Sequence, residues 1–107
     1  MIDRNMLYFY QRALLGAAVV HGALCVDAVL ALGADAFADA EPATRRIYET
    51  LTQMRQAGEP ISLLTVTATI GEEIEPELAR CCEFAAAPDE VAFFGQKLRG
   101  ASSLSSV

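Results

Sequence analysis

The stretch PATRRIYETLTQMRQAGEPISLLTVTATI at residues 42–70 contains the clearest periodic pattern in the chain. Over residues 42–57, apolar side chains recur at helical spacing and form a stripe on one face. Pro42 suits the first turn of a helix and Gly58 suits its exit, so an amphipathic helix is predicted here. Arg45 belongs to its charged face, which we expect to be solvated. The apolar stripe comprises Ile47, Tyr48, Leu51 and Met54.

The segment SLLTVTATI at residues 62–70 allows two interpretations. Its apolar residues alternate with Thr65, Thr67 and Thr69, which is typical of a strand. Ser62 is also an N-cap signal, and the apolar residues fit one helical face as well. No other segment can pair with an isolated strand, whose backbone groups would stay unsatisfied. We therefore predict a helix capped by Ser62.

Four more short helices are predicted outside this stretch, over residues 5–20, 23–32, 76–86 and 88–99. The fold class is accordingly predicted to be all-α, a compact bundle of about six short helices. The residues expected at the helix ends are Asn5, Gly33 and Gly100.

One domain is predicted over residues 1–100, because a chain of 107 residues is long enough for a single core only. Residues 101–107 are rich in serine and are predicted to be a flexible tail or the start of a linker. Phe37 is expected to anchor the loop 34–41 to the core. The predicted core comprises Phe37, Leu51, Met54, Leu78, Cys82, Val91, Phe94 and Leu98.

Hydrophobic residues make up 53% of the chain, and its mean hydropathy is +0.30. One small core needs less than this, so the surplus predicts self-association into dimers or higher oligomers. The net charge is −6 and the pI is about 4.6. An acidic chain lacks the positive patch that phosphate binding requires, so direct binding of nucleic acid is not expected. Its acidic surface favours basic protein partners.

Three cysteines without a matching export signal predict reduced thiols and a cytoplasmic location. The apolar run at residues 13–20 resembles the core of a signal peptide, but it is short, and Asp3 lies where positive charge is required. No stretch approaches the roughly 20 apolar residues of a transmembrane helix, so no membrane partner is expected. Cys25 and Cys82 are interpreted as small buried hydrophobes.

No catalytic, cofactor-binding or metal-binding residues are predicted. The chain has neither a P-loop nor a G-x-S-x-G motif, and its cysteines and His21 lack zinc-ligand spacing. Glutamates around the start of the helix predicted at 76–86 suggest a metal or acid–base site, but glutamates at such positions usually face water. We interpret them as solvated. The group comprises Glu72, Glu73, Glu75 and Glu77.

Two motifs within residues 42–66 carry a family resemblance. PATRRIYE at residues 42–49 is similar to the pattern P-A-H-R-x-I-F/Y-E, and GEPISLLTV at residues 58–66 is similar to G-x-P-I-D-x-x-T-V. In this order and spacing, the chain resembles the N-terminal domain of the DnaB family of replicative DNA helicases, over roughly residues 7–99. The motif and helix-cap positions are Pro42, Arg45, Ile47, Tyr48, Gly58, Pro60, Ile61, Ser62 and Thr65.

The resemblance implies a helical domain that carries no catalysis, although a full-length family protein is an ATP-dependent DNA helicase. In the family this domain oligomerises into the collar of the hexamer and docks primase or a helicase loader. For this chain it therefore implies self-association, a primase or loader as partner and a role in the primosome during DNA replication. Thr44 departs from the family histidine, and no motor domain follows in the sequence, so we expect an excised domain or a free-standing relative.

Three other functions stay open. A free-standing adaptor or inhibitor of phage or plasmid type would capture a host replicative helicase. A small helix-turn-helix DNA-binding protein would pair residues 62–70 with 76–86, although only Arg80 is basic on the second helix. An enzyme with a glutamate-rich metal site would gain thermal stability on metal binding.

Overall fold

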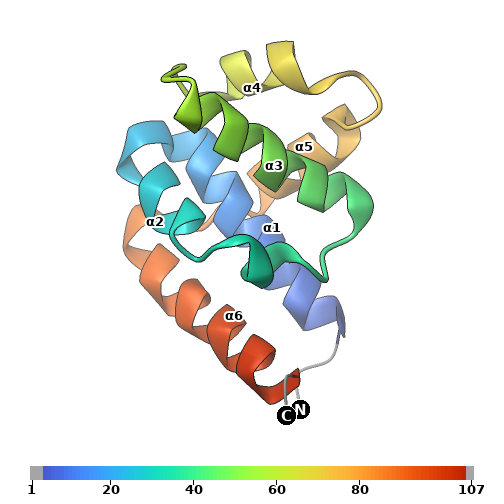
Figure 1. Ribbon diagram of the computed structural model, residues 1–107, viewed down its shortest axis with the longest axis vertical. Coiled ribbons are helices and arrows are strands. Elements are labelled where there is room, and N and C mark those ends of the chain that lie inside the picture. Colours follow the sequence, from blue (N-terminus) through green and yellow to red (C-terminus); the bar gives the residue numbers. More distant parts are fainter. Residues whose placement is uncertain (1–3, 106–107) are drawn as a thin grey trace.

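The computed structural model describes the backbone of residues 4–105 and the side chains of residues 4–100. These residues form helices and turns without a strand, which confirms the predicted all-α fold (Figure 1). Short 3₁₀ turns separate some of the helices: η1 (Gly22–Leu24), η2 (Ala34–Phe37) and η3 (Pro88–Glu90). The α-helices of the described chain are α1 (Arg4–His21), α2 (Val26–Leu30), α3 (Pro42–Gln56), α4 (Leu63–Ile70), α5 (Glu75–Glu83) and α6 (Val91–Ser105).

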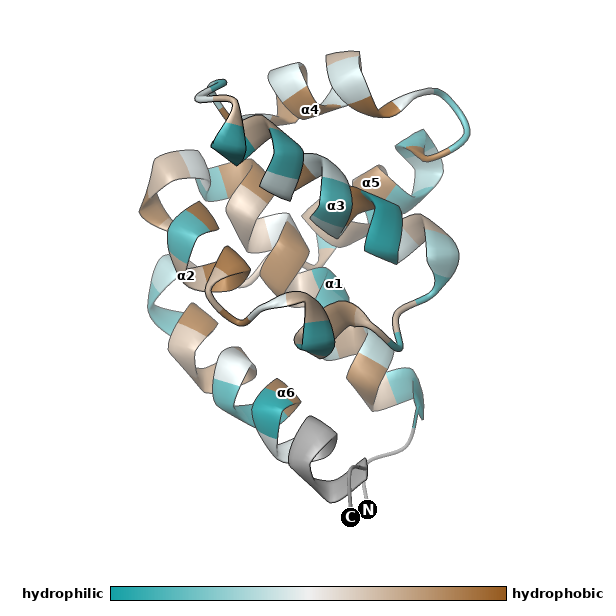
Figure 2. Ribbon diagram, in the orientation of Figure 1, coloured by the Kyte–Doolittle hydropathy of each residue, from teal (hydrophilic) through white to brown (hydrophobic). Residues whose placement is uncertain are grey.

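Helix α1 runs through the middle of the molecule, with α4 and α6 at opposite ends of the long axis (Figure 1). Residues 13–19 of α1 are buried on all sides, and the helix packs mainly against α5 and α6. Figure 2 shows hydrophobic residues along α1 and hydrophilic residues along the outer side of α3. An apolar surface all round requires cover from every direction, so the other helices surround α1. Neither α1 nor another described helix is long and apolar enough to cross a membrane.

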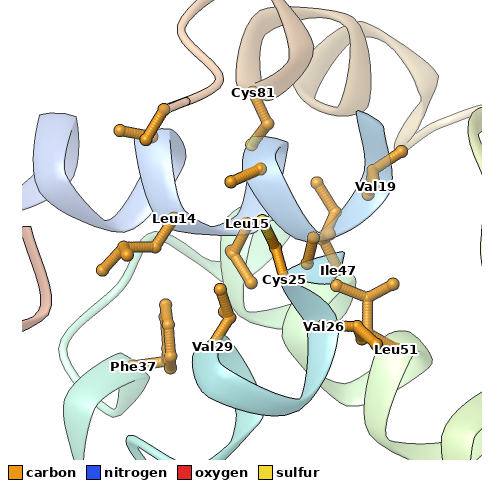
Figure 3. Close-up of a cluster of buried hydrophobic side chains, with 14 of the residues drawn as sticks. Leu14, Leu15, Val19, Cys25, Val26, Val29, Phe37, Ile47, Leu51 and Cys81 are labelled. Atoms are coloured by element: carbon orange, nitrogen blue, oxygen red, sulfur yellow. The ribbon is translucent and has the colours of Figure 1, made fainter. Parts of the chain in front are cut away.

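Side chains from α1, α2, η2, α3 and α5 converge in the core (Figure 3). Phe37 is fully buried there and stacks on Tyr48, with 4.6 Å between the ring centroids. This contact anchors the 3₁₀ turn between α2 and α3. The other predicted core residues that are buried are Leu51, Met54, Leu78, Val91 and Leu98.

Two predicted core residues, Cys82 and Phe94, are only half-buried and pack against the core cluster from its edge. Successive residues of a helix point about 100° apart, so α5 cannot bury both of its adjacent cysteines equally. Cys81, on the side facing α1, is fully buried instead. Phe94 packs at the edge of the core beside Phe9 and Tyr10.

Helices α1 and α5 approach closely at Gly16. A Cβ atom at this position would overlap the carbonyl oxygen of Cys81 and would lie 3.0 Å from the Cα of Ala85. The lack of a side chain therefore allows the two backbones to meet. The contact continues past the end of α5, where the Ala86 N–H donates to the carbonyl oxygen of Ala13 at 3.0 Å.

The segment at residues 62–70 is helical, as predicted, and Ser62 is the N-cap of α4. The Ser62 Oγ accepts a hydrogen bond from the Thr65 N–H at 3.2 Å, while the Ser62 N–H donates to the Thr65 Oγ1 at 2.9 Å. This reciprocal capping box satisfies two backbone donors that a helix start leaves free. Local capping therefore prevails over the β-branched, alternating pattern of the segment.

Several predicted helix ends are wrong by a few residues. Asn5 lies inside α1 rather than before it, and residues 23–32 divide into η1 and α2. Gly33, with φ 87°, lies beyond the end of α2. Helix α6 continues through Gly100, because an isolated glycine is tolerated within a helix.

The domain boundary after residue 100 and the flexible tail at residues 101–107 stay predictions. Helix α6 runs through the predicted boundary to Ser105. Residues 1–3, at the start of the predicted domain, and residues 106–107, at the end of the predicted tail, lie outside the described residues.

Candidate interaction surfaces

Large apolar side chains on the surface are candidate contact points for other proteins. Two groups stand out in the described chain, one of aromatic residues and one beside α4. Sequence reasoning assigned Leu78, Cys82 and Phe94 of these groups to the core and predicted neither surface, because apolar character alone does not distinguish a core residue from a surface residue. The exposed large apolar side chains among the described residues are Met6, Val20, Leu24, Leu63, Leu64, Phe84 and Phe93.

An aromatic surface forms where α1, the end of α5 and α6 meet. Phe9 contacts both Phe84 and Phe94 edge-on, with 5.9 Å between the ring centroids in each pair. Phe84 is 47% exposed and Phe93 is 54% exposed, so part of the cluster faces solvent. Aromatic side chains are enriched at protein–protein contacts. We define the aromatic surface as Phe9, Tyr10, Phe84, Phe93 and Phe94.

A groove of about 480 Å³ lies between α4 and α5. The lining residues that come from α5 all lie on one face of that helix, because residues three, four and seven positions apart share a face. Carboxylates at both ends of this face, Glu75 and Glu83, are exposed. We define the α4–α5 groove by its lining, which comprises Leu63, Thr67, Glu75, Leu78, Ala79, Cys82 and Glu83.

A partly buried ionic network joins α1, α3 and α5. Arg12 Nε donates to Glu77 Oε2 at 2.8 Å, and Thr44 Oγ1 donates to the same oxygen at 2.7 Å. The Arg12 guanidinium also reaches Glu41, with Nη2 2.6 Å from Oε1. The network thus satisfies the charge of Glu77, whose side chain is only 9% exposed.

The interpretation of Glu77 as a solvated glutamate is wrong, because α5 turns this carboxylate toward α1 and α3. Burial alone would raise the pKa of Glu77, but hydrogen bonds from Arg12 and Thr44 outweigh it and lower the pKa below its ordinary value. The hydrogen bond to Glu77 likewise raises the pKa of Arg12. Glu72, Glu73 and Glu75 are exposed, as interpreted.

The cysteines offer no activated nucleophile. Burial, followed by the charge of Glu77, raises the pKa of the Cys81 thiol well above its ordinary range. Burial also raises the pKa of Cys25 and Cys82, so all three thiols are protonated at neutral pH. Within residues 4–105, no three histidine, cysteine or acidic side chains are grouped closely enough to hold a metal ion.

The predicted motif positions lie in and between α3 and α4, and they act on structure rather than forming one site. Pro42 is the first residue of α3, and Ile47 is fully buried in the core. Arg45 is exposed, and its Nη1 donates to the carbonyl oxygen of Ala38 at 3.4 Å. Gly58 adopts φ 74° at the exit of α3. The connection to α4 contains exposed Pro60 and half-buried Ile61.

A family model described as the DnaB-like helicase N-terminal domain matches residues 9–86. The match includes the stretch from α2 to α5 and most of α1, and it ends before α6. Neither a curated protein nor a solved structure matches the chain.

Proposed function

Because the chain belongs to the DnaB-like helicase N-terminal domain family, we propose that it is a non-catalytic oligomerisation and protein-docking module of a replicative DNA helicase. Its partners in this role are further copies of itself and a primase or a helicase loader. The match over residues 9–86 is the observation that carries the proposal.

The two exposed apolar regions support both halves of this proposal. The aromatic surface suits self-association, because apolar rings meet an identical copy without charge repulsion. The α4–α5 groove suits a different partner, since a two-fold contact there would bring Glu75 and Glu83 toward the same acidic residues of a second copy.

The acidic charge supports protein partners over DNA. Helix α5 would be the recognition helix of a helix-turn-helix protein, yet it carries Glu75 and Glu83 on its exposed side with Arg80 as its basic residue. Phosphate contacts depend on clustered Lys and Arg side chains. The phosphates of DNA would therefore repel this acidic face of α5.

Light scattering over a range of concentrations tests self-association, and calorimetry with a primase C-terminal domain or a loader from the same organism tests docking. We expect a mass above that of the monomer and binding to one of the two proteins. A strictly monomeric chain that binds neither protein would contradict the proposal.

A further inference from the structure

We propose that the α4–α5 groove binds a cationic amphipathic helix of a partner protein, one that presents an apolar stripe flanked by lysine or arginine. This inference rests on the proposed docking function and specifies its surface and the chemistry of its partner. At this groove an apolar lining and an exposed acidic rim coincide.

The apolar lining of the groove is accessible. Leu63 is 49% exposed at the rim, and its neighbour Leu64 is 80% exposed. Helix α4 contacts α1, α3 and α5, and the groove lies open between α4 and α5. A hollow of about 480 Å³ accommodates several apolar side chains of a bound helix. Grooves of this kind take side chains at positions i, i+3, i+4 and i+7.

The charges around the groove determine whether it favours a positively or a negatively charged partner helix. Glu75 and Glu83 lie at the rim, and Glu72 and Glu73 precede them on the exposed turn that leads into α5. Glu77 does not add to this field, because Arg12 neutralises it inside the protein. The Arg80 Nη1 lies 3.7 Å from Glu77 Oε1, and Arg80 is not one of the residues that line the groove. The rim therefore attracts a cationic helix and repels an anionic one.

The same charges argue against a second copy as the occupant. The chain carries a net charge of −6, and each copy would bring its own acidic rim to a two-fold contact. A partner with lysine or arginine beside an apolar stripe places opposite charges against Glu75 and Glu83 and leucine-like side chains against the accessible Leu63 and Ala79.

Fluorescence anisotropy of labelled model helices titrated with the full chain tests the inference. The first probe is a four-turn peptide with leucines at i, i+3, i+4 and i+7 and lysines at the flanking positions. The second replaces every lysine by glutamate, and the third scrambles the order of the first so that no apolar stripe forms. We expect binding of the first probe alone, with an affinity that falls as salt is added.

Variants of the chain locate the binding. The double charge reversal Glu75→Lys with Glu83→Lys should lower the affinity for the cationic probe by at least about tenfold. The control Glu49→Lys with Glu59→Lys makes the same change in net charge at exposed positions outside the groove and should leave affinity within about twofold. Leu63→Ser should also weaken binding about tenfold, while Phe93→Ser, at a similarly exposed residue of the aromatic surface, should not.

Three results would overturn the inference. The first is failure of the cationic probe to bind, and the second is equal loss of affinity in the groove variants and their controls. The third is a lower oligomeric mass for the Glu75→Lys, Glu83→Lys chain in light scattering, which would make the groove a contact between copies. If the groove fails while the chain still self-associates or binds a primase or loader, the proposed function stands.

Discussion

Arg12 on α1 and Glu77 on α5 form a buried ion pair, with the Arg12 Nε 2.8 Å from the Glu77 Oε2. The pair lies 65 residues apart in the sequence and closes the bundle beside the Gly16 contact between the same two helices. Thr44 completes the coordination of the carboxylate from α3. The Glu77 side chain thus links α5 to α1 and α3, and these two hydrogen-bond partners explain why it faces inward.

Replacing Glu77 with Gln should destabilise the fold by about 2–3 kcal/mol, because the Arg12 charge loses its main partner in a poorly solvated site. Chemical denaturation followed by circular dichroism measures this. Glu75→Gln, at an exposed glutamate of the same helix, is the matched control and should change the free energy of unfolding by less than about 0.5 kcal/mol. Equal effects at the two positions would contradict a structural role for the ion pair.

The lowered pKa of Glu77 predicts a pH dependence with a definite sign. The stabilising contribution is complete above the unfolded-state pKa of about 4.3 and is lost as pH falls through the lower folded-state pKa. Thermal unfolding of the wild type and of Glu77→Gln across pH should therefore show the largest difference in Tm near neutral pH. This difference in Tm should shrink below about pH 4. A constant difference down to acid pH would contradict a lowered pKa for Glu77.

Gly16→Ala should destabilise the chain by about 1–3 kcal/mol, since the new Cβ meets the backbone of α5 rather than a movable side chain. Gly100→Ala is the control, because no atom lies within 4 Å of a Cβ built there. That substitution should stabilise α6 by up to about 1 kcal/mol through helix propensity. Denaturant midpoints that shift the same way in both variants would argue against a close contact at Gly16.

Ser62→Ala should cost about 1 kcal/mol, because it removes the acceptor of the Thr65 N–H at the start of α4. Ser62→Asp keeps a capping oxygen and should retain most of the stability. Urea denaturation compares the two variants with the wild type. If Ser62→Asp is destabilised as much as Ser62→Ala, the cap does not account for the effect.

Phe93→Ser should weaken self-association at least about tenfold, because it removes an exposed ring from the aromatic surface. Sedimentation equilibrium gives the association constant directly. Leu64→Ser removes an apolar, more exposed side chain on α4, outside the aromatic surface, and serves as the control. An unchanged mass for Phe93→Ser would exclude this ring from the contact between copies.

The helices could be predicted from the sequence because their signals are local. The stripe through Ile47 and Leu51, Pro42 at the start of α3 and the cap at Ser62 each act within a few residues. Helix ends were predicted less well, since Gly100 is compatible with both a stop and a continuing helix. The α4–α5 groove and the aromatic surface could not be predicted, because they depend on how separate helices pack.

The chain by itself therefore determined the helical class, the main amphipathic helix and the acidic balance, all of which follow from residue order and composition. Only the tertiary structure decided which of two adjacent cysteines is buried, that Glu77 faces Arg12, and that Leu63 stays accessible. The physical reason is range: capping and periodicity act over one or two helical turns, whereas burial and ion pairing depend on segments distant in sequence that meet only in the folded bundle.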